Sequence, residues 1–256
     1  MIAVVGNLSL DRIAGAPPRI GGGPYHAARA LRLLAARGEI VARCADADRR
    51  FLLPRLARLG IPLQVLHGSH TTAFSFEYDG ETRVMSVDAI GDAWTPHDAR
   101  AVDRRVRWVH VAPLLRSDFP AETLAELGRG RRLLLDAQGL VRRPEIGPLH
   151  LDADFDSELL RHVSILKLAE EEAAIVGEVD VAERIVSLGS HGSIVYADGR
   201  ETRVPARALA RDPTGAGDAF AAGLLAARVG GAAPAEALAA GAGLAARAVG
   251  RPGGRP

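Results

Sequence analysis

The sequence has very little of several residue types that mark particular classes of protein. Cys44 is the only cysteine, so the chain can form neither an intramolecular disulfide nor a cysteine-rich metal site. Lys167 is the only lysine, so nearly all positive charge comes from arginine. No uncharged apolar run approaches the roughly 20 residues that span a bilayer, and the apolar residues 2–5 are too few for a signal peptide. We therefore expect a cytoplasmic protein without a membrane segment.

An excess of charge of either sign is also absent. The 32 Lys+Arg residues nearly match the 31 Asp+Glu residues, which leaves a formal net charge of +1. This balance gives no electrostatic basis for a nucleic-acid or membrane-surface partner. The length of 256 residues and the hydrophobic content of 48% suit one globular domain over residues 1–256.

Short apolar runs alternate with longer amphipathic stretches, which is typical of an α/β fold. The predicted strands cover residues 2–5, 40–43, 108–112, 132–136, 163–166, 184–188 and 193–196. The predicted helices cover residues 24–36, 48–59, 120–127, 157–161, 170–176, 216–229 and 234–249. The alternation predicts a parallel α/β core.

One region departs from this alternation. Residues 71–79 and 81–88 alternate polar and apolar side chains around Asp79-Gly80, which is a strong hairpin signal. Residues 12–20 supply a further strand nearby, so we expect a β lid formed by segments of about 12–20 and 63–88. The alternative is an ordinary edge hairpin. An exposed hairpin edge could pair between subunits, so we expect a monomer or a homodimer.

The most informative segment is a run of tiny residues that opens an apolar helix. Gly215 and Gly217 lie in its first turn, although each glycine there costs roughly 1 kcal/mol relative to alanine. The absence of side chains lets an anion reach the free N–H groups of the helix start. Asp218 would repel a phosphate there unless it takes the proton of an attacking hydroxyl, as phosphoryl transfer requires. The alternative is purely structural, with Thr214 as the N-cap and Asp218 complementing the helix dipole.

Other phosphate-binding loops do not fit this chain. Phe220 occupies the third-glycine position of the dinucleotide fingerprint, which argues against a nucleotide-binding oxidoreductase. The only lysine lies between Leu166 and Leu168, so a Walker loop is excluded, and the protein-kinase motifs are missing.

Residues 212–220, Asp-Pro-Thr-Gly-Ala-Gly-Asp-Ala-Phe, closely resemble the second signature of the PfkB (ribokinase-like) carbohydrate kinase family. Residues 21–28 resemble its N-terminal Gly-Gly signature, residues 167–172 its Asn-x-x-Glu segment, and residues 187–192 the loop that borders its nucleotide. The resemblance implies a ribokinase-like three-layer α/β/α fold with a mostly parallel central sheet and a small antiparallel β lid. It also implies ATP and Mg²⁺ as cofactors, with K⁺ as an optional third.

The resemblance assigns a role to individual residues. Asp218 is the expected catalytic base, and Glu172 is expected to hold Mg²⁺ through water. The expected anion hole comprises Gly215, Ala216 and Gly217. The expected acceptor-binding residues are Asp11, Gly22, Gly23, His26, Gln138 and Arg142. The expected ATP-binding residues are Lys167, Ser187, Gly189 and Gly192, and Asp212 and Thr214 lie where related kinases bind a monovalent cation.

Some of these residues have simpler interpretations, and two depart from the family pattern. Asp11 could be a turn aspartate, Gly22 and Gly23 a tight turn, and residues 170–172 an acidic helix start. His26 replaces an Asn that contacts the sugar in the family, and Ala169 replaces the Asn of Asn-x-x-Glu.

A narrower resemblance bears on the substrate. Residues 136–142 and 110–114 are similar to a branch of the family that includes inositol kinases. We therefore expect an ATP-dependent kinase that transfers the γ-phosphate to a hydroxyl of a small sugar or cyclitol, with myo-inositol as the leading acceptor. The alternatives are a nucleoside kinase of the same fold and a sugar- or nucleotide-binding sensor that has lost turnover.

Overall fold

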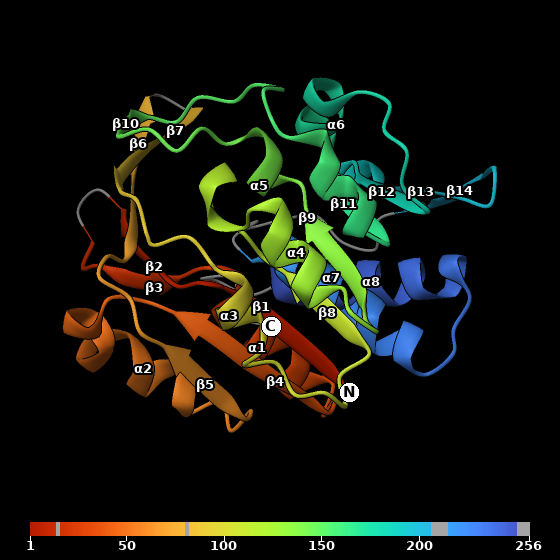
Figure 1. The fold of residues 1–256 in the computed structure, drawn as a ribbon. Coiled ribbons are helices and arrows are strands. Elements are labelled where there is room, and N and C mark those ends of the chain that lie inside the picture. Colours follow the sequence, from red (N-terminus) through yellow and green to blue (C-terminus); the bar gives the residue numbers. More distant parts are fainter. Residues whose placement is uncertain (14–15, 80–81, 206–214, 250–256) are drawn as a thin grey trace.

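The centre of the molecule is a mostly parallel sheet (Figure 1). The computed structural model describes residues 1–13, 16–79, 82–205 and 215–249. Within them, the strands of this sheet pair in the order β14-β13-β12-β11-β9-β8-β1-β4-β5, and only the pairs that involve β13 are antiparallel. The strands are β1 (Ile2–Asn7), β4 (Gly38–Arg43), β5 (Leu63–Leu66), β8 (Trp108–Val111), β9 (Arg132–Asp136), β11 (Ile165–Ala169), β12 (Glu183–Ser187), β13 (Ser193–Ala197) and β14 (Arg200–Val204).

Helices cover both faces of this sheet because its strands are apolar on both sides. Ile2 and Val4 of β1 belong to one buried cluster, whereas Ala3 and Val5 belong to another. The first cluster includes residues of α1 (Gly23–Leu33), α2 (Arg49–Ala57), α7 (Ala216–Val229) and α8 (Pro234–Val249). The second includes residues of α3 (Pro96–Ala99), α4 (Ala121–Leu127), α5 (Gln138–Val141) and α6 (Glu170–Val176). The expected three-layer α/β/α arrangement is confirmed.

A second, smaller sheet projects from the core at the left of Figure 1. Its strands are β2 (Ser9–Ile13), β3 (Arg19–Gly21), β6 (Thr72–Asp79), β7 (Thr82–Ala89) and β10 (Gly147–Pro148), in the order β10-β7-β6-β2-β3. All its pairs are antiparallel except β2 with β6. Phe74, Phe76 and Val87 form an apolar cluster with Leu114 and Leu115 of the core. This sheet corresponds to the predicted lid.

Two boundaries of the predicted lid are wrong. Residues 63–66, expected in the lid, form strand β5 and pair with β4 at the edge of the central sheet. An edge strand with half-buried leucines has the same short pattern in either sheet, so the sequence could not assign it. Residues 12–20 contribute to two strands, β2 and β3, rather than to one.

Several local predictions also differ in type or extent. Residues 157–161 lie in the 3₁₀ helix η3 (Ser157–His162), and the helix expected from residue 48 is preceded by the 3₁₀ helix η1 (Asp46–Asp48). Strands β5, β10 and β14 and the single-turn helices α3 and α5 were not predicted. Each of these elements has five residues or fewer, which is too short for a periodic pattern to be recognised.

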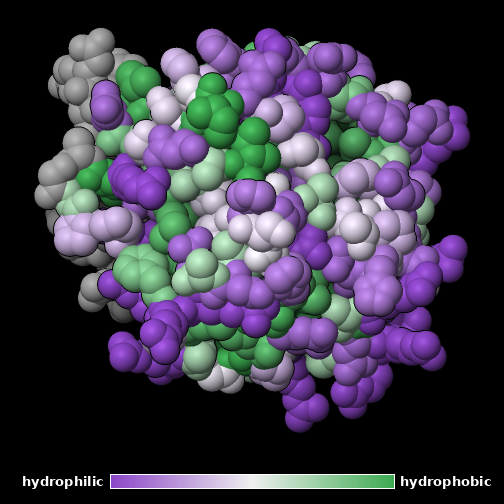
Figure 2. Space-filling model, turned by 60° about the vertical axis from the view of Figure 1, so that its left-hand side comes forward, coloured by the Kyte–Doolittle hydropathy of each residue, from purple (hydrophilic) through white to green (hydrophobic). Residues whose placement is uncertain are grey.

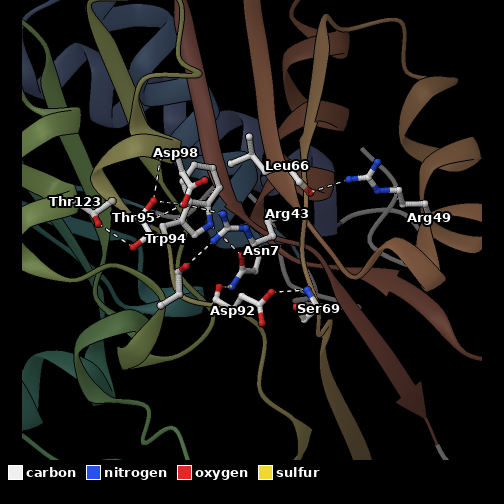
Figure 3. A network of polar contacts seen from close by, with 11 residues as sticks. Asn7, Arg43, Arg49, Leu66, Ser69, Asp92, Trp94, Thr95, Asp98 and Thr123 are labelled. Atoms are coloured by element: carbon white, nitrogen blue, oxygen red, sulfur yellow. Dashed lines mark hydrogen bonds and ion pairs between the residues drawn. The ribbon is translucent and has the colours of Figure 1, made fainter.

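A polar network fixes the segment that returns from the lid to the core (Figure 3). The Trp94 indole donates to Asn7 Oδ1 at 2.9 Å, and Asn7 Nδ2 donates to the Asp92 carbonyl at 3.1 Å. The Arg43 guanidinium donates to the Ala93 carbonyl at 2.5 Å and pairs with Asp98 at 2.7 Å. These bonds join the ends of β1 and β4 to the chain that leaves β7, and so position the lid sheet relative to the core.

The surface in Figure 2 is largely hydrophilic, and its apolar residues form separate groups. The large apolar side chains that are exposed come from different elements: Leu34, Phe51, Val84, Ile146 and Val229. No helix among the described residues is both long enough and apolar enough to span a membrane.

Candidate active site

Two cavities open at the carboxyl ends of the parallel strands, where α/β sheets bind their ligands. One, of about 680 Å³, extends under the lid sheet. The other, of about 800 Å³, extends along α6 toward the end of β12. The residues that line both cavities are Gln138, Arg142, Ala169, Glu171, Glu172, Gly215 and Asp218. The site is therefore two compartments that meet at the start of α7.

Asp218, the predicted base, lies where the two compartments meet. It is the third residue of α7, and its Oδ1 is buried without a hydrogen-bond partner among the described residues. Burial raises the pKa of this carboxyl, His26 opposes the rise, and the Asp136 carboxylate adds to it. A carboxylate with a raised pKa and an unused lone pair is suited to accept a proton from a ligand.

The residues predicted to form an anion hole lie at the start of α7. Gly215 has a φ of +76°, in the left-handed region, and its carbonyl accepts the first helical bond from the Ala219 N–H at 2.9 Å. The N–H groups of the next residues therefore lack intrahelical acceptors. A Cβ on Gly215 would lie 2.5 Å from His26 Nδ1, and one on Gly217 would lie 3.0 Å from Lys167 Nζ. Glycine is needed at position 215, and polar side chains lie close to the turn at both positions.

All six predicted acceptor-binding residues line the cavity under the lid: Asp11, Gly22, Gly23, His26, Gln138 and Arg142. The Ser9 hydroxyl donates to Asp11 Oδ1 at 2.7 Å, and Gln138 Nε2 donates to the Pro113 carbonyl at 2.7 Å. Gly22 has a φ of +93°, which favours glycine at this position. Gly23 packs so closely that a Cβ there would lie 2.8 Å from Asp218 Oδ1.

The opposite wall of this cavity is apolar, and the sequence analysis missed it. The wall includes Phe74, Phe76, Val84, Met85, Leu114 and Leu149. The alternating pattern of the hairpin showed that one face of it was apolar, but not which cavity that face lines. The compartment thus offers hydroxyl-binding groups on one side and a surface for C–H groups on the other.

The second cavity contains three of the four predicted ATP-binding residues, Lys167, Ser187 and Gly189. Gly192 is not among its described lining residues. Its carbonyl accepts from the Leu188 N–H at 2.8 Å, so it closes the turn that presents Gly189. Asp212 and Thr214, expected at a monovalent cation, lie outside the described residues.

Glu172, the residue expected to hold Mg²⁺ through water, lies beside a second acid, Glu171. Both line the two cavities, and Glu172 Oε2 accepts the Ala169 N–H at 2.8 Å, which fixes its direction. Burial raises the pKa of Glu172, and the ammonium of Lys167 opposes the rise. Carboxylate oxygens at a cavity wall match the preference of Mg²⁺ for carboxylate ligands. Ala169 lacks the amide side chain of the family pattern, but its backbone N–H still orients Glu172.

A buried charged network lies behind Asp218. Lys167 Nζ lies 2.6 Å from Asp136 Oδ1, and His110 Nε2 lies 3.4 Å from Asp136 Oδ2. Burial alone would raise the pKa of Asp136, but Lys167 and His110 hold it well below its usual range. Ligand atoms of His110, Asp136 and Asp218 lie within 4.8 Å of one another, as in a metal site. The ammonium of Lys167 already supplies the positive charge there, so this cluster does not suit a metal ion.

Comparisons with known proteins agree with this architecture. The model of the pfkB family of carbohydrate kinases matches residues 18–256. An inositol 3-kinase of Oryza sativa subsp. japonica is 37% identical over 157 residues, covering 49% of this chain and 39% of that protein. The chain thus spans about two fifths of the length of the curated relatives it matches.

Solved structures show the same fold at low identity. A pyrophosphate-dependent kinase of the ribokinase family, complexed with a pyrophosphate analog and myo-inositol, aligns over 100% of this chain and 97% of its own, with a TM-score of 0.86 and 22% identity. A nucleoside kinase of Burkholderia thailandensis in complex with inosine aligns over 100% and 92%, with a TM-score of 0.79 and 19% identity.

The fold is that of ribokinase-like kinases, with an α/β/α core and a β lid. More specifically, the chain belongs to the pfkB family of carbohydrate kinases.

Proposed function

We propose that this protein is an ATP-dependent kinase that phosphorylates a hydroxyl of a small sugar or cyclitol, with myo-inositol as the leading acceptor. The observation that carries the proposal is the position of Asp218, which lines both cavities at the N-terminus of α7. A base at this junction can reach an acceptor hydroxyl in one compartment and a phosphoryl group from the other. The proposed kinase unit comprises residues 1–256, and its ligands are small molecules in the cytoplasm.

The reaction is a direct in-line transfer. Asp218 takes the proton of the acceptor hydroxyl as its oxygen attacks the γ-phosphorus of ATP. The bond from that phosphorus to the bridging oxygen breaks, and ADP leaves with the electron pair. The N–H groups of the α7 turn stabilise the charge on the transferring group. Mg²⁺ held through water by Glu172 would neutralise donor phosphate charge, and the lid sheet would exclude water.

The acceptor cavity favours a compact polyol. The Asp11 carboxylate can accept from two neighbouring hydroxyls, and Ser9 holds it in place. The apolar lid residues opposite suit the C–H groups of a ring. The similarity to an inositol 3-kinase supports a cyclitol as the acceptor.

A nucleoside kinase is the second candidate, supported by the likeness to a kinase that binds inosine. A non-catalytic sensor is disfavoured because Asp218 and Glu172 are both present and both line the cavities.

The test is product formation across a panel of inositols, pentoses, hexoses and nucleosides. ATP and inorganic pyrophosphate should be compared as donors, because a kinase of the same fold uses pyrophosphate. We expect ADP release with one acceptor class, lost at least about 100-fold in Asp218→Asn. Near-normal turnover in that variant would refute the assignment of the base. Turnover with pyrophosphate alone would refute the proposed donor but not the kinase.

A further inference from the structure

Behind the proposed active site, three buried polar residues lie on adjacent parallel strands. His110 is on β8, Asp136 ends β9, and Lys167 is on β11. His110 is 0% exposed, and Asp136 and Lys167 are each 5% exposed, although both also line the second cavity. Buried ionised groups are expensive unless paired, so a network of this kind needs a reason.

Asp136 has both carboxylate oxygens directed at positively charged or proton-donating groups. Oδ1 lies 2.6 Å from the Lys167 ammonium, and Oδ2 lies 3.4 Å from His110 Nε2. The carboxylate therefore has a fixed orientation, and the ammonium bound to it has a fixed position. His110 has no exposed surface and is not among the described lining residues of either cavity.

The position of the ammonium relates this network to the chemistry. Lys167 lines the second cavity, which contains most of the predicted ATP-binding residues. Its Nζ would lie 3.0 Å from a Cβ built on Gly217. The ammonium is therefore directly beneath the anion hole at the start of α7. A Cβ at position 217 would require the ammonium to shift by a few tenths of an ångström.

We propose that Asp136, oriented by His110, is a positioning residue that holds the Lys167 ammonium beneath the anion hole, where its charge faces the transferring phosphoryl group. The inference rests on the proposed kinase function. It assigns roles to His110, which is not among the described lining residues of either cavity, and to Asp136, which lines the second.

The competing partners of Lys167 explain why a positioning residue is needed. The carboxylates of Asp136, Glu172 and Asp218 all face this ammonium, and Asp218 also faces His26 and His110. Without Asp136, the ammonium would pair with Asp218 or Glu172. A pair with Asp218 would make the base weaker, and either pair would move charge away from the phosphoryl group.

Lys167 can be observed directly because it is the only lysine in the chain. Selective ¹⁵N-lysine labelling of this 256-residue chain therefore gives a single side-chain ammonium signal in NMR spectra. Burial opposes the charged form of Lys167, but Asp136 and the other carboxylates outweigh it and raise its pKa. In Asp136→Asn we expect the signal to titrate at lower pH than in the wild type, and to respond less to inorganic pyrophosphate.

Kinetics supply the second measurement. We expect Asp136→Asn to lower kcat by roughly 10- to 100-fold, as for other residues that orient a charged group, with little change in acceptor KM. The acidic limb of its kcat profile should move to lower pH, because Asp218 loses a neighbouring negative charge and gains the ammonium. Loss of stability alone would lower activity without moving this limb.

The matched control is Asp98→Asn. Asp98 also pairs with a buried cation, Arg43 at 2.7 Å, but neither residue lines a cavity (Figure 3). This variant should leave the lysine titration and the kinetics of the folded protein unchanged. If Asp136→Asn does not fold, His110→Gln provides the test, with smaller changes in the same direction.

A lysine signal in Asp136→Asn or His110→Gln that titrates as in the wild type, or an unaltered kcat, would overturn the positioning role. Failure of the proposed function is a different result. It would appear as a wild-type protein without turnover on any acceptor, whereas the lysine signal would still report whether Asp136 holds the ammonium.

Discussion

Replacing Gly215 by alanine should reduce both stability and turnover, and the structure separates two causes. The first is backbone strain, because the φ of +76° costs an alanine roughly 1–2 kcal/mol. The second is contact, because the new Cβ would lie 2.5 Å from His26 Nδ1 and 2.8 Å from its Cγ. Displacing a packed ring in this way costs roughly 1–3 kcal/mol. Together they predict a loss of about 2–5 kcal/mol in the free energy of unfolding.

Gly199→Ala is the matched control for this substitution. Gly199 has a similar φ of +69°, but no atom lies within 4 Å of its would-be Cβ. It lies in the turn between β13 and β14 and lines neither cavity. This variant should lose only the strain, about 1–2 kcal/mol, and keep its turnover.

Thermal unfolding and ADP release measure the two effects. For a chain of this size, each kcal/mol should lower Tm by roughly 2–4 °C. Gly215→Ala should also lose most of its turnover, because the anion-hole amides and His26 move apart. In a His26→Ala background, Gly215→Ala should lower the free energy of unfolding by less, because the contact with the His26 ring is gone. Equal Tm losses in both glycine variants, or full turnover in Gly215→Ala, would refute the reasoning.

Three further predictions concern Asp11, Asp218 and the ion pair of Asp98 with Arg43. Asp11→Asn should raise the acceptor KM roughly 10-fold or more, because a hydrogen bond to a charged group contributes about 1.5–3 kcal/mol. An unchanged KM in steady-state assays would contradict the proposed role of Asp11 in binding acceptor hydroxyls. Because burial raises the pKa of Asp218 and catalysis needs its ionised form, activity should be lost as pH falls through a midpoint above the usual 3.8; a midpoint at or below that value would argue against this base. Asp98→Ala should lower the free energy of unfolding by roughly 3 kcal/mol, because it leaves Arg43 buried without its carboxylate. Denaturant titration measures this, and a change under 1 kcal/mol would contradict it.

Local patterns were sufficient for much of the fold and for the residue proposed as the base. Helix α7 was predicted with its observed bounds, residues 216–229, because the glycines before an apolar run mark a helix start. The hairpin of β6 and β7 followed from alternation around Asp79-Gly80. Elements of about one turn, such as α5 (Gln138–Val141), were missed because so few residues hold no period.

The sequence by itself determined that this is an α/β protein with a glycine-rich helix start and an acid in its first turn. Each of those features depends on residues close together in the chain. Only the tertiary structure decided which distant side chains meet. Asp136 is separated from His110 by 26 residues and from Lys167 by 31, yet parallel pairing places all three on adjacent strands. Strand order is set by packing of whole elements, so no local pattern could reveal this network behind Asp218.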